Sequence, residues 1–171
     1  WAGKSSHGQR HEPERTVNIL IVNPNTTASM TEKMGRVAAG VAGSGVSVRA
    51  VNPADGPASI EGYYDEAFSV PGLIATIRDE PPADAYVLAC FDDTGLDAAR
   101  CIAPGPVIGI GEAAFHMASL VAGRFSVVTT LQRSVAAIEH NLVRYGLASR
   151  CAAVRAAEVA VLELERPGSD A

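Results

Sequence analysis

The stretch VNILIVNPNTT, residues 17–27, decides the fold of this chain. It begins with a continuous aliphatic run, which is typical of a strand buried on both faces in a parallel sheet. It ends in a turn rich in Asn and Pro, after which the sequence predicts a helix over about residues 27–42. Parallel strands need such a helical connection, so this stretch predicts an α/β protein.

The same alternation continues along the chain. A second strand is predicted over 45–53, a helix over 64–78, a third strand over 84–90 and a helix over 95–103. Strands that alternate with helices in this way predict a doubly wound α/β layer.

The second half of the chain repeats the first at an offset of 106 residues. ILIV (19–22) falls on FSVV (125–128), and VRA (48–50) falls on VRA (154–156). Both copies have the order strand, polar turn, helix, strand. The repeat predicts two similar lobes that face each other, with a cleft between the carboxyl ends of their strands.

This repeat divides the chain into a first α/β lobe over 17–104 and a second over 105–171. Residues 1–16, WAGKSSHGQRHEPERT, are polar and without periodicity. We interpret them as a disordered lead or a remnant of an expression vector.

Composition narrows the class of protein. With 171 residues, of which 47% are hydrophobic, the chain can bury a substantial core. The net charge of −5, with scattered basic residues, argues against nucleic acid as a partner. No apolar run approaches the roughly 18 residues of a membrane span, and a signal-peptide order is missing. We therefore predict a soluble, cytoplasmic protein without a membrane partner, whose three cysteines are free thiols.

Cys90 is the candidate for chemistry, in the stretch VLACFDDTGLDAA (87–99). It follows a predicted strand and precedes a helix, whose N-terminal amides would lower the thiol pKa. The alternative is a packing role, since free cysteine is often buried. The position at a strand end favours function, whereas Cys101 and Cys151 are predicted to be packing residues.

Other motifs have structural interpretations. GIGEAA (109–114) matches the dinucleotide pattern GxGxxA, but Thr129 stands where an acidic residue would be needed. We therefore interpret the glycines as a tight strand-to-helix turn. His116 lies in an apolar helix and is predicted to be a core histidine. Asp92 and Asp93 are predicted to be a helix N-cap and its neighbour, and no cluster has metal-ligand spacing.

Four motifs together resemble the Asp/Glu/hydantoin racemase family, and within it the hydantoin and allantoin racemases most. They are NILIVNPNTTASMT (18–31), VLACFDDTGL (87–96), VIGIGEAAFHMASL (107–120) and FSVVTT (125–130). The resemblance implies two doubly wound lobes with parallel sheets, related by pseudo-twofold symmetry. It also implies one cysteine from each lobe on either side of the substrate's Cα.

The resemblance maps the first cysteine onto Cys90. Its substrate-binding positions fall on Pro24, Asn25, Thr26, Phe91, Thr129 and Thr130. The chain departs from the family in two places. The usual Phe-Gly-Asp-Pro-Gly motif is Phe-Asp-Asp-Thr-Gly here, and the extra carboxylate would tend to raise the thiol pKa. The second cysteine would fall near position 196, beyond residue 171, so the second lobe is predicted to be truncated.

The implied activity is a cofactor-independent racemase or epimerase of a small cyclic amide, such as a 5-substituted hydantoin or allantoin. Inversion needs an acid/base group on each face of Cα and hydrogen-bond donors for the enolate oxygen, which the polar turns supply. Pyridoxal phosphate needs a buried lysine, and Lys4 and Lys33 do not suit it. We expect a small-molecule substrate and a homo-oligomer, because an incomplete lobe exposes an apolar sheet edge.

Two alternatives remain. A decarboxylase or a cis-trans isomerase of the same superfamily would use the same cleft. A non-catalytic binding module or an inactive fragment would be a different class, favoured by the missing second cysteine. The discriminating observation is whether the reading frame continues to a cysteine near 196.

Overall fold

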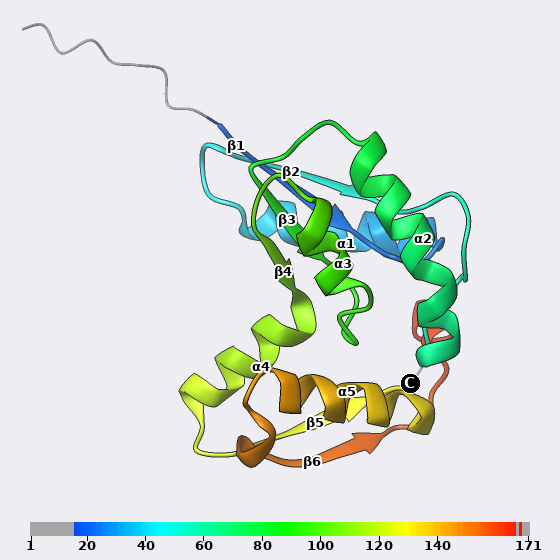
Figure 1. Ribbon diagram of the computed structural model, residues 1–171, viewed down its shortest axis with the longest axis vertical. Coiled ribbons are helices and arrows are strands. Elements are labelled where there is room, and N and C mark those ends of the chain that lie inside the picture. The colour runs from blue at the N-terminus through cyan, green and yellow to red at the C-terminus, as the bar shows by residue number, and fades with distance from the viewer. Residues whose placement is uncertain (1–15, 167, 169–171) are drawn as a thin grey trace, which may run out of the picture.

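A computed structural model describes residues 16–166 and 168, so nearly all of the predicted lead over 1–16 lies outside the described residues. A four-stranded parallel sheet forms the first lobe, in the order β2-β1-β3-β4 (Figure 1). Its strands are β1 (Val17–Val22), β2 (Val46–Val51), β3 (Ala85–Leu88) and β4 (Val107–Gly109), and its helices are α1 (Ala28–Val41), α2 (Tyr63–Asp79) and α3 (Leu96–Ile102).

Helix α4 (Ile110–Val121) leads from β4 to the second lobe. There β5 (Phe125–Thr129) and β6 (Cys151–Ala156) pair in parallel, connected by α5 (Gln132–Arg144) and a short 3-10 helix, Ala148–Arg150. After β6 the chain returns to the first lobe through a second 3-10 helix, η2 (Val161–Glu165), where Glu165 pairs with Lys33 of α1.

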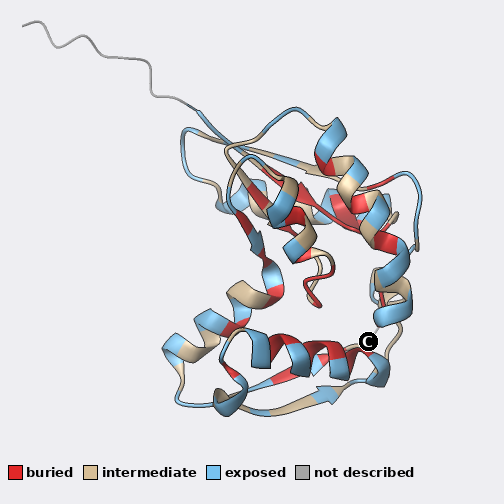
Figure 2. Ribbon diagram, in the orientation of Figure 1, coloured by how far each residue is buried: buried red, intermediate tan, exposed pale blue. Residues whose placement is uncertain are grey.

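Each lobe has its own hydrophobic core (Figure 2). The first core packs α2 and α3 on the sheet through Leu20, Leu73, Leu88 and Leu96. The second packs α5 and α4 on β5, through Phe115, Val127, Ile138 and Leu142. Two separate cores confirm the predicted α/β architecture of two lobes with parallel sheets.

The internal repeat is also present in three dimensions. The unit β1-α1-β2 has its counterpart in β5-α5-β6, and both strand pairs are parallel. Strand β4 lies beyond the division that we predict after residue 104, yet it pairs with β3 in the first sheet. The first sheet therefore extends to Gly109, while the division into lobes at 104 stays a prediction.

The carboxylate of Asp93 joins the two lobes. It accepts hydrogen bonds from the backbone amides of Gly111 (2.9 Å) and Glu112 (2.7 Å), at the N-terminus of α4. The hydroxyl of Tyr145, just after α5, donates to the same carboxylate at 2.7 Å. A Cβ at Gly109 would lie 2.1 Å from Asp93 Oδ1. The glycines of GIGEAA thus make room for an internal carboxylate, and the predicted tight strand-to-helix turn is confirmed.

Three smaller predictions are wrong. The N-cap of α3 is Gly95, because Asp93 turns its carboxylate to α4 instead. His116 is exposed and so is Cys101, because each lies on the outer side of its helix. Cys151, by contrast, packs against the second core as predicted, and all three cysteines are free thiols.

Further polar contacts hold the lobes together. Arg133 of α5 forms an ion pair with Glu61, whose other carboxylate oxygen accepts a hydrogen bond from the amide of Val161. Tyr63 Oη and His140 Nδ1 lie 2.5 Å apart across the lobes. No helix in the described part of the chain is both long and apolar enough to cross a membrane.

Replacing the hydroxyl that bridges the lobes should weaken the fold. We expect Tyr145→Phe to lower the free energy of unfolding by about 1–2 kcal/mol, because the buried Asp93 carboxylate loses one of its donors. Urea denaturation measures the change. The matched control is Tyr64→Phe, since Tyr64 is 76% exposed. Equal stabilities of the two variants would contradict the bridging role of Tyr145.

Candidate active site

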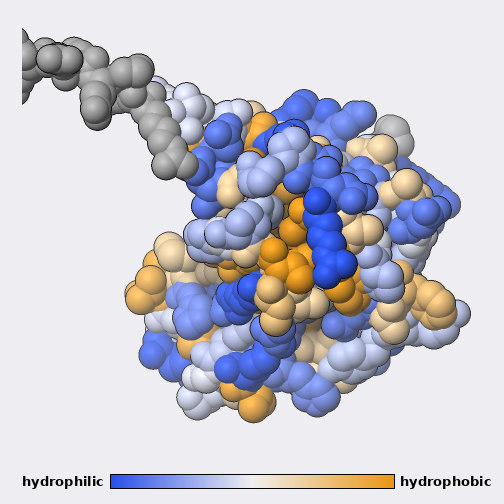
Figure 3. Space-filling model, turned by 45° about the horizontal axis from the view of Figure 1, so that its top comes forward, coloured by the Kyte–Doolittle hydropathy of each residue, from blue (hydrophilic) through white to orange (hydrophobic). Residues whose placement is uncertain are grey.

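A cavity of about 470 Å³ lies between the lobes, where β1, β3, β5 and β6 end. Hydrophobic residues gather in the hollow between the lobes on the face shown in Figure 3. Most of the cavity wall is apolar, and its polar side chains come from the carboxyl ends of strands, the turns after them and the first turn of α5. The wall includes Met30, Met34, Ile60, Ile110, Val159, Val161 and Leu164, together with the polar or reactive Asn25, Cys90, Asp92, Thr129, Thr130 and Ser134.

The structure brings most of the predicted site residues together. Asn25, Cys90, Phe91, Thr129 and Thr130 all line this one cavity. The turns of the first and second sheets therefore face each other across it, as the repeat predicts.

Pro24 and Thr26 are not among the residues that line the cavity. Pro24 is fully buried, and Thr26 Oγ1 donates to the carbonyl oxygen of Pro57 at 3.4 Å. These two residues shape the turn, whereas Asn25 between them faces the cavity.

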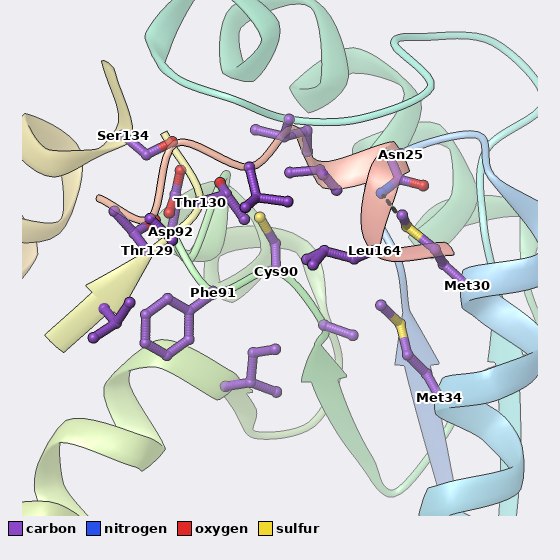
Figure 4. A pocket seen from close by; sticks show the side chains of 17 residues that line it. Asn25, Met30, Met34, Cys90, Phe91, Asp92, Thr129, Thr130, Ser134 and Leu164 are labelled. Carbon is purple, nitrogen blue, oxygen red and sulfur yellow. Dashed lines mark hydrogen bonds between the residues drawn. The ribbon is translucent and has the colours of Figure 1, made fainter. Parts of the chain in front are cut away.

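Cys90 lies between two polar groups of the cavity wall, as Figure 4 shows. Asn25 is on one side of it, and Asp92, Thr129 and Thr130 are on the other. It lies two residues after the end of β3 and is half-buried, with its Sγ 3.6 Å from Thr94 Oγ1. The first lobe therefore contributes the thiol of Cys90 to the cavity wall.

Burial raises the pKa of Cys90 to about 11, and the charge of Asp92 adds to the rise. Hydrogen bonds with the side chain and backbone of Thr94 and with the backbone of Asp92 oppose it only in part. The predicted lowering of the pKa by a helix N-terminus is therefore wrong. Helix α3 begins only at Leu96, and loss of solvent outweighs its amides. The extra carboxylate of the motif, Asp92, raises the pKa of Cys90, as the sequence predicts.

The side chain of Asn25 is held rigidly at the cavity. Its Oδ1 accepts hydrogen bonds from Asn23 Nδ2 and from the amide of Thr27, both at 2.9 Å. Its Nδ2 points toward Met30 Sδ at 3.6 Å (Figure 4). Because the oxygen is fully used inside the turn, the amide group presents its donor to the cavity.

Sequence reasoning did not assign Asp92 to the site, although its departure from the family motif was a signal. Its side chain is 9% exposed and lines the cavity. Burial raises the pKa of Asp92 to about 6, and the charges of Glu66 and Asp93 add to the rise. The Ser134 hydroxyl opposes it, although Ser134 Oγ has no partner in ordinary hydrogen-bond geometry. Nothing in the sequence marked Ser134.

The candidate site contains no lysine in its wall. Lys33 lies on α1 and pairs with Glu165 at 3.3 Å. Within the described residues, no group of three His, Cys, Asp or Glu side chains is placed to hold a metal ion. The prediction of a cofactor-independent site stays a prediction.

The fold and the cavity define an α/β protein of two facing lobes with a thiol between their polar turns. The Asp/Glu/hydantoin racemase family matches residues 19–171 of this sequence. The chain belongs to this family.

Relatives of known sequence agree with this assignment. The hydantoin racemase of Rhizobium meliloti is 52% identical over 151 residues, which are 87% of this chain and 63% of the relative. The hydantoin racemase of Pseudomonas sp. (strain NS671) is 43% identical, over 88% of this chain and 61% of its own length. The chain thus spans somewhat less than two thirds of the curated relatives that it matches.

A solved structure gives the same picture. The allantoin racemase from Klebsiella pneumoniae superposes with a TM-score of 0.86 at 48% sequence identity, over 89% of this chain and 63% of that chain. A match of this quality confirms the α/β fold, with a second lobe that is incomplete relative to that structure.

The raised pKa of Cys90 predicts slow alkylation. At about pH 8, iodoacetamide should label the exposed Cys101 faster than Cys90, because only the thiolate reacts. In the variant Asp92→Asn, loss of the neighbouring charge should lower the pKa of Cys90 and speed its labelling by about 3- to 10-fold. Mass spectrometry of the labelled peptides measures both rates. An equal rate of Cys90 labelling in the wild type and in Asp92→Asn would show that the Asp92 charge does not affect the Cys90 thiol.

The raised pKa of Asp92 predicts a pH-dependent cost in stability. Its folded-state value of about 6 lies above the ordinary 3.8, so the ionised form above pH 6 destabilises the folded state. Asp92→Asn should therefore raise the free energy of unfolding by about 1–2 kcal/mol at about pH 7.5. The gain should fade as the pH falls from about 6 toward 4, where the native carboxyl is protonated.

Urea denaturation at the two pH values measures this difference. The exposed Asp79, at the end of α2, gives a matched control in Asp79→Asn, which should change little at either pH. A gain from Asp92→Asn that persists unchanged at low pH would show that ionisation is not its cause.

Proposed function

We propose that the protein carrying this chain is a cofactor-independent racemase or epimerase that inverts the Cα of a small cyclic amide. The observation that carries the proposal is the position of Cys90, in the cavity between the polar turns of two facing sheets. The relatives named hydantoin racemase and allantoin racemase support a 5-substituted hydantoin or allantoin as substrate.

The raised pKa of Cys90 fixes its starting role in this proposal. A thiol with a pKa of about 11 is protonated near neutral pH, so it begins as the proton donor to one face of Cα. A second group must remove the proton from the opposite face. We place that group at the second cysteine that the family resemblance implies, which the repeat would put near position 196. When the reaction runs in reverse, the two groups exchange roles.

The developing enolate needs donors that are already in place. Asn25 Nδ2 and the hydroxyls of Thr129 and Thr130 are donors in the cavity wall on the two sides of Cys90. The remaining wall is apolar, which strengthens hydrogen bonds to a developing charge. Pro24, Thr26 and Phe91 would support these groups from behind or beside them.

Self-association and a cytoplasmic location belong to the same proposal. Large aliphatic side chains are exposed on α4 and β5, among them Leu120, Val121 and Val128 at 77%, 81% and 68%. Exposed apolar surface of this kind favours contact with a second copy. The three free thiols suit a reducing compartment.

Proton exchange tests the role of Cys90 separately from inversion. In D₂O, the thiolate form of Cys90 should remove the Cα proton of the enantiomer whose hydrogen faces it and return a deuteron from the same face. The chain should therefore exchange the Cα proton of that single enantiomer of a 5-substituted hydantoin while its optical rotation decays slowly, and the raised pKa of Cys90 should make the exchange faster at higher pH. NMR and polarimetry follow the two processes. Cys90→Ser should slow the enzymatic exchange by about 100-fold or more.

Cys101→Ser is the matched control, since Cys101 is exposed and is not among the residues that line the cavity. Fast racemisation by this chain alone would show that another residue supplies the second acid/base group. Exchange that survives in Cys90→Ser would refute the catalytic role of Cys90.

A further inference from the structure

The cavity contains a buried polar pair that the proposed proton transfer does not use. Ser134 is 1% exposed, and its Oγ makes no hydrogen bond of ordinary geometry within the described residues, although the hydroxyl interacts with the Asp92 carboxylate and lowers its pKa. The Asp92 carboxylate lies beside it in the cavity wall, and the two side chains point toward one another (Figure 4).

The fold does not explain this pair. Asp92 contributes to the structure through its backbone carbonyl, which accepts a hydrogen bond from Asn141 Nδ2 at 2.7 Å. Its carboxylate has no cationic partner among the described ion pairs, and its charged neighbours Glu66 and Asp93 are acidic. The contact with the Ser134 hydroxyl compensates the carboxylate only in part, since the pKa of Asp92 stays raised at about 6. The pair therefore costs stability unless a ligand completes its hydrogen bonds.

The chemistry of the pair defines what would complete them. Asp92 offers an acceptor and Ser134 a donor, side by side. In an ordinary open-chain amide the N–H and C=O groups point in opposite directions, because the amide is trans. A five-membered ring forces the cis amide, so N–H and C=O point the same way and match one acceptor and one donor.

We propose that Asp92 and Ser134 form the recognition edge for the cis-amide group of a cyclic substrate. The Asp92 carboxylate accepts the ring N–H, and the Ser134 hydroxyl donates to the neighbouring carbonyl oxygen. This inference rests on the proposed function and adds the specificity-determining residues to it. It selects ring amides over open-chain ones, and it fixes one edge of the ring two residues along the chain from Cys90.

The test compares the binding of 5-methylhydantoin by the wild-type chain and by its variants, measured by isothermal titration calorimetry. Asp92→Asn and Ser134→Ala should each weaken binding by about tenfold or more, as expected when a buried polar group loses its hydrogen-bond partner. Asp79→Asn and the exposed Ser47→Ala are the matched controls and should bind like the wild type. Thermal melting shows that each variant is folded.

Methylated ligands separate recognition from a structural role. One of the N1-methyl and N3-methyl derivatives lacks the N–H that Asp92 accepts. With that derivative, Asp92→Asn should bind within about twofold of the wild type, because the interaction is already absent. With the other derivative, the loss should remain about tenfold.

Two results would overturn the inference. Equal losses with all three ligands would show that Asp92 acts on the shape of the cavity and not on a ring N–H. Wild-type affinity in both Asp92→Asn and Ser134→Ala would remove the recognition edge but leave the proposed racemase standing. Failure of the wild-type chain to bind any hydantoin would count against the proposed function itself, and the inference would fall with it.

Discussion

The carboxylate of Asp93 at the N-terminus of α4 is the contact on which the rest of the structure depends. Two backbone amides and the Tyr145 hydroxyl converge on it, so it joins the loop after β3, the helix between the lobes and the end of α5. An anion at this end of a helix is favoured by the unpaired amides and the helix dipole. The usual occupant of a glycine-rich turn is an external phosphate, whereas here the chain supplies its own carboxylate.

This contact also determines what faces the cavity. Asp93 has a positive φ of 52°, which turns its side chain toward α4. The preceding Asp92 is directed to the cavity side of the same loop, next to Cys90. One aspartate therefore serves the architecture and its neighbour is available to a ligand, although their sequence positions differ by one.

Much of the fold could be predicted because its signals are local. The aliphatic run predicts strand β1, and the Asn-Pro turn marks where it ends. The repeat predicts a second unit of the same kind at β5. None of these signals needs tertiary information. The Asp93 contact could not be predicted, since it joins two residues that are 18 positions apart in the sequence, with α3 and β4 between them. Cys101 was misplaced because α3 has only seven residues, too few for a clear apolar face. For Cys90, the motif predicts that Asp92 raises the thiol pKa. It does not predict the burial of the thiol, which is the larger cause of the rise.

The position of the polar pair connects the site to the architecture. Asp92 belongs to the first lobe and Ser134 to the first turn of α5 in the second. Their acceptor and donor are side by side only while the lobes keep their mutual orientation, which the contacts of Asp93 with α4 and Tyr145 maintain. A chain selected for stability alone would not bury an ionised carboxylate beside a thiol and two further acids. The cost is consistent with a cavity whose polar groups are arranged for a ligand, and whose shape is fixed before the ligand arrives.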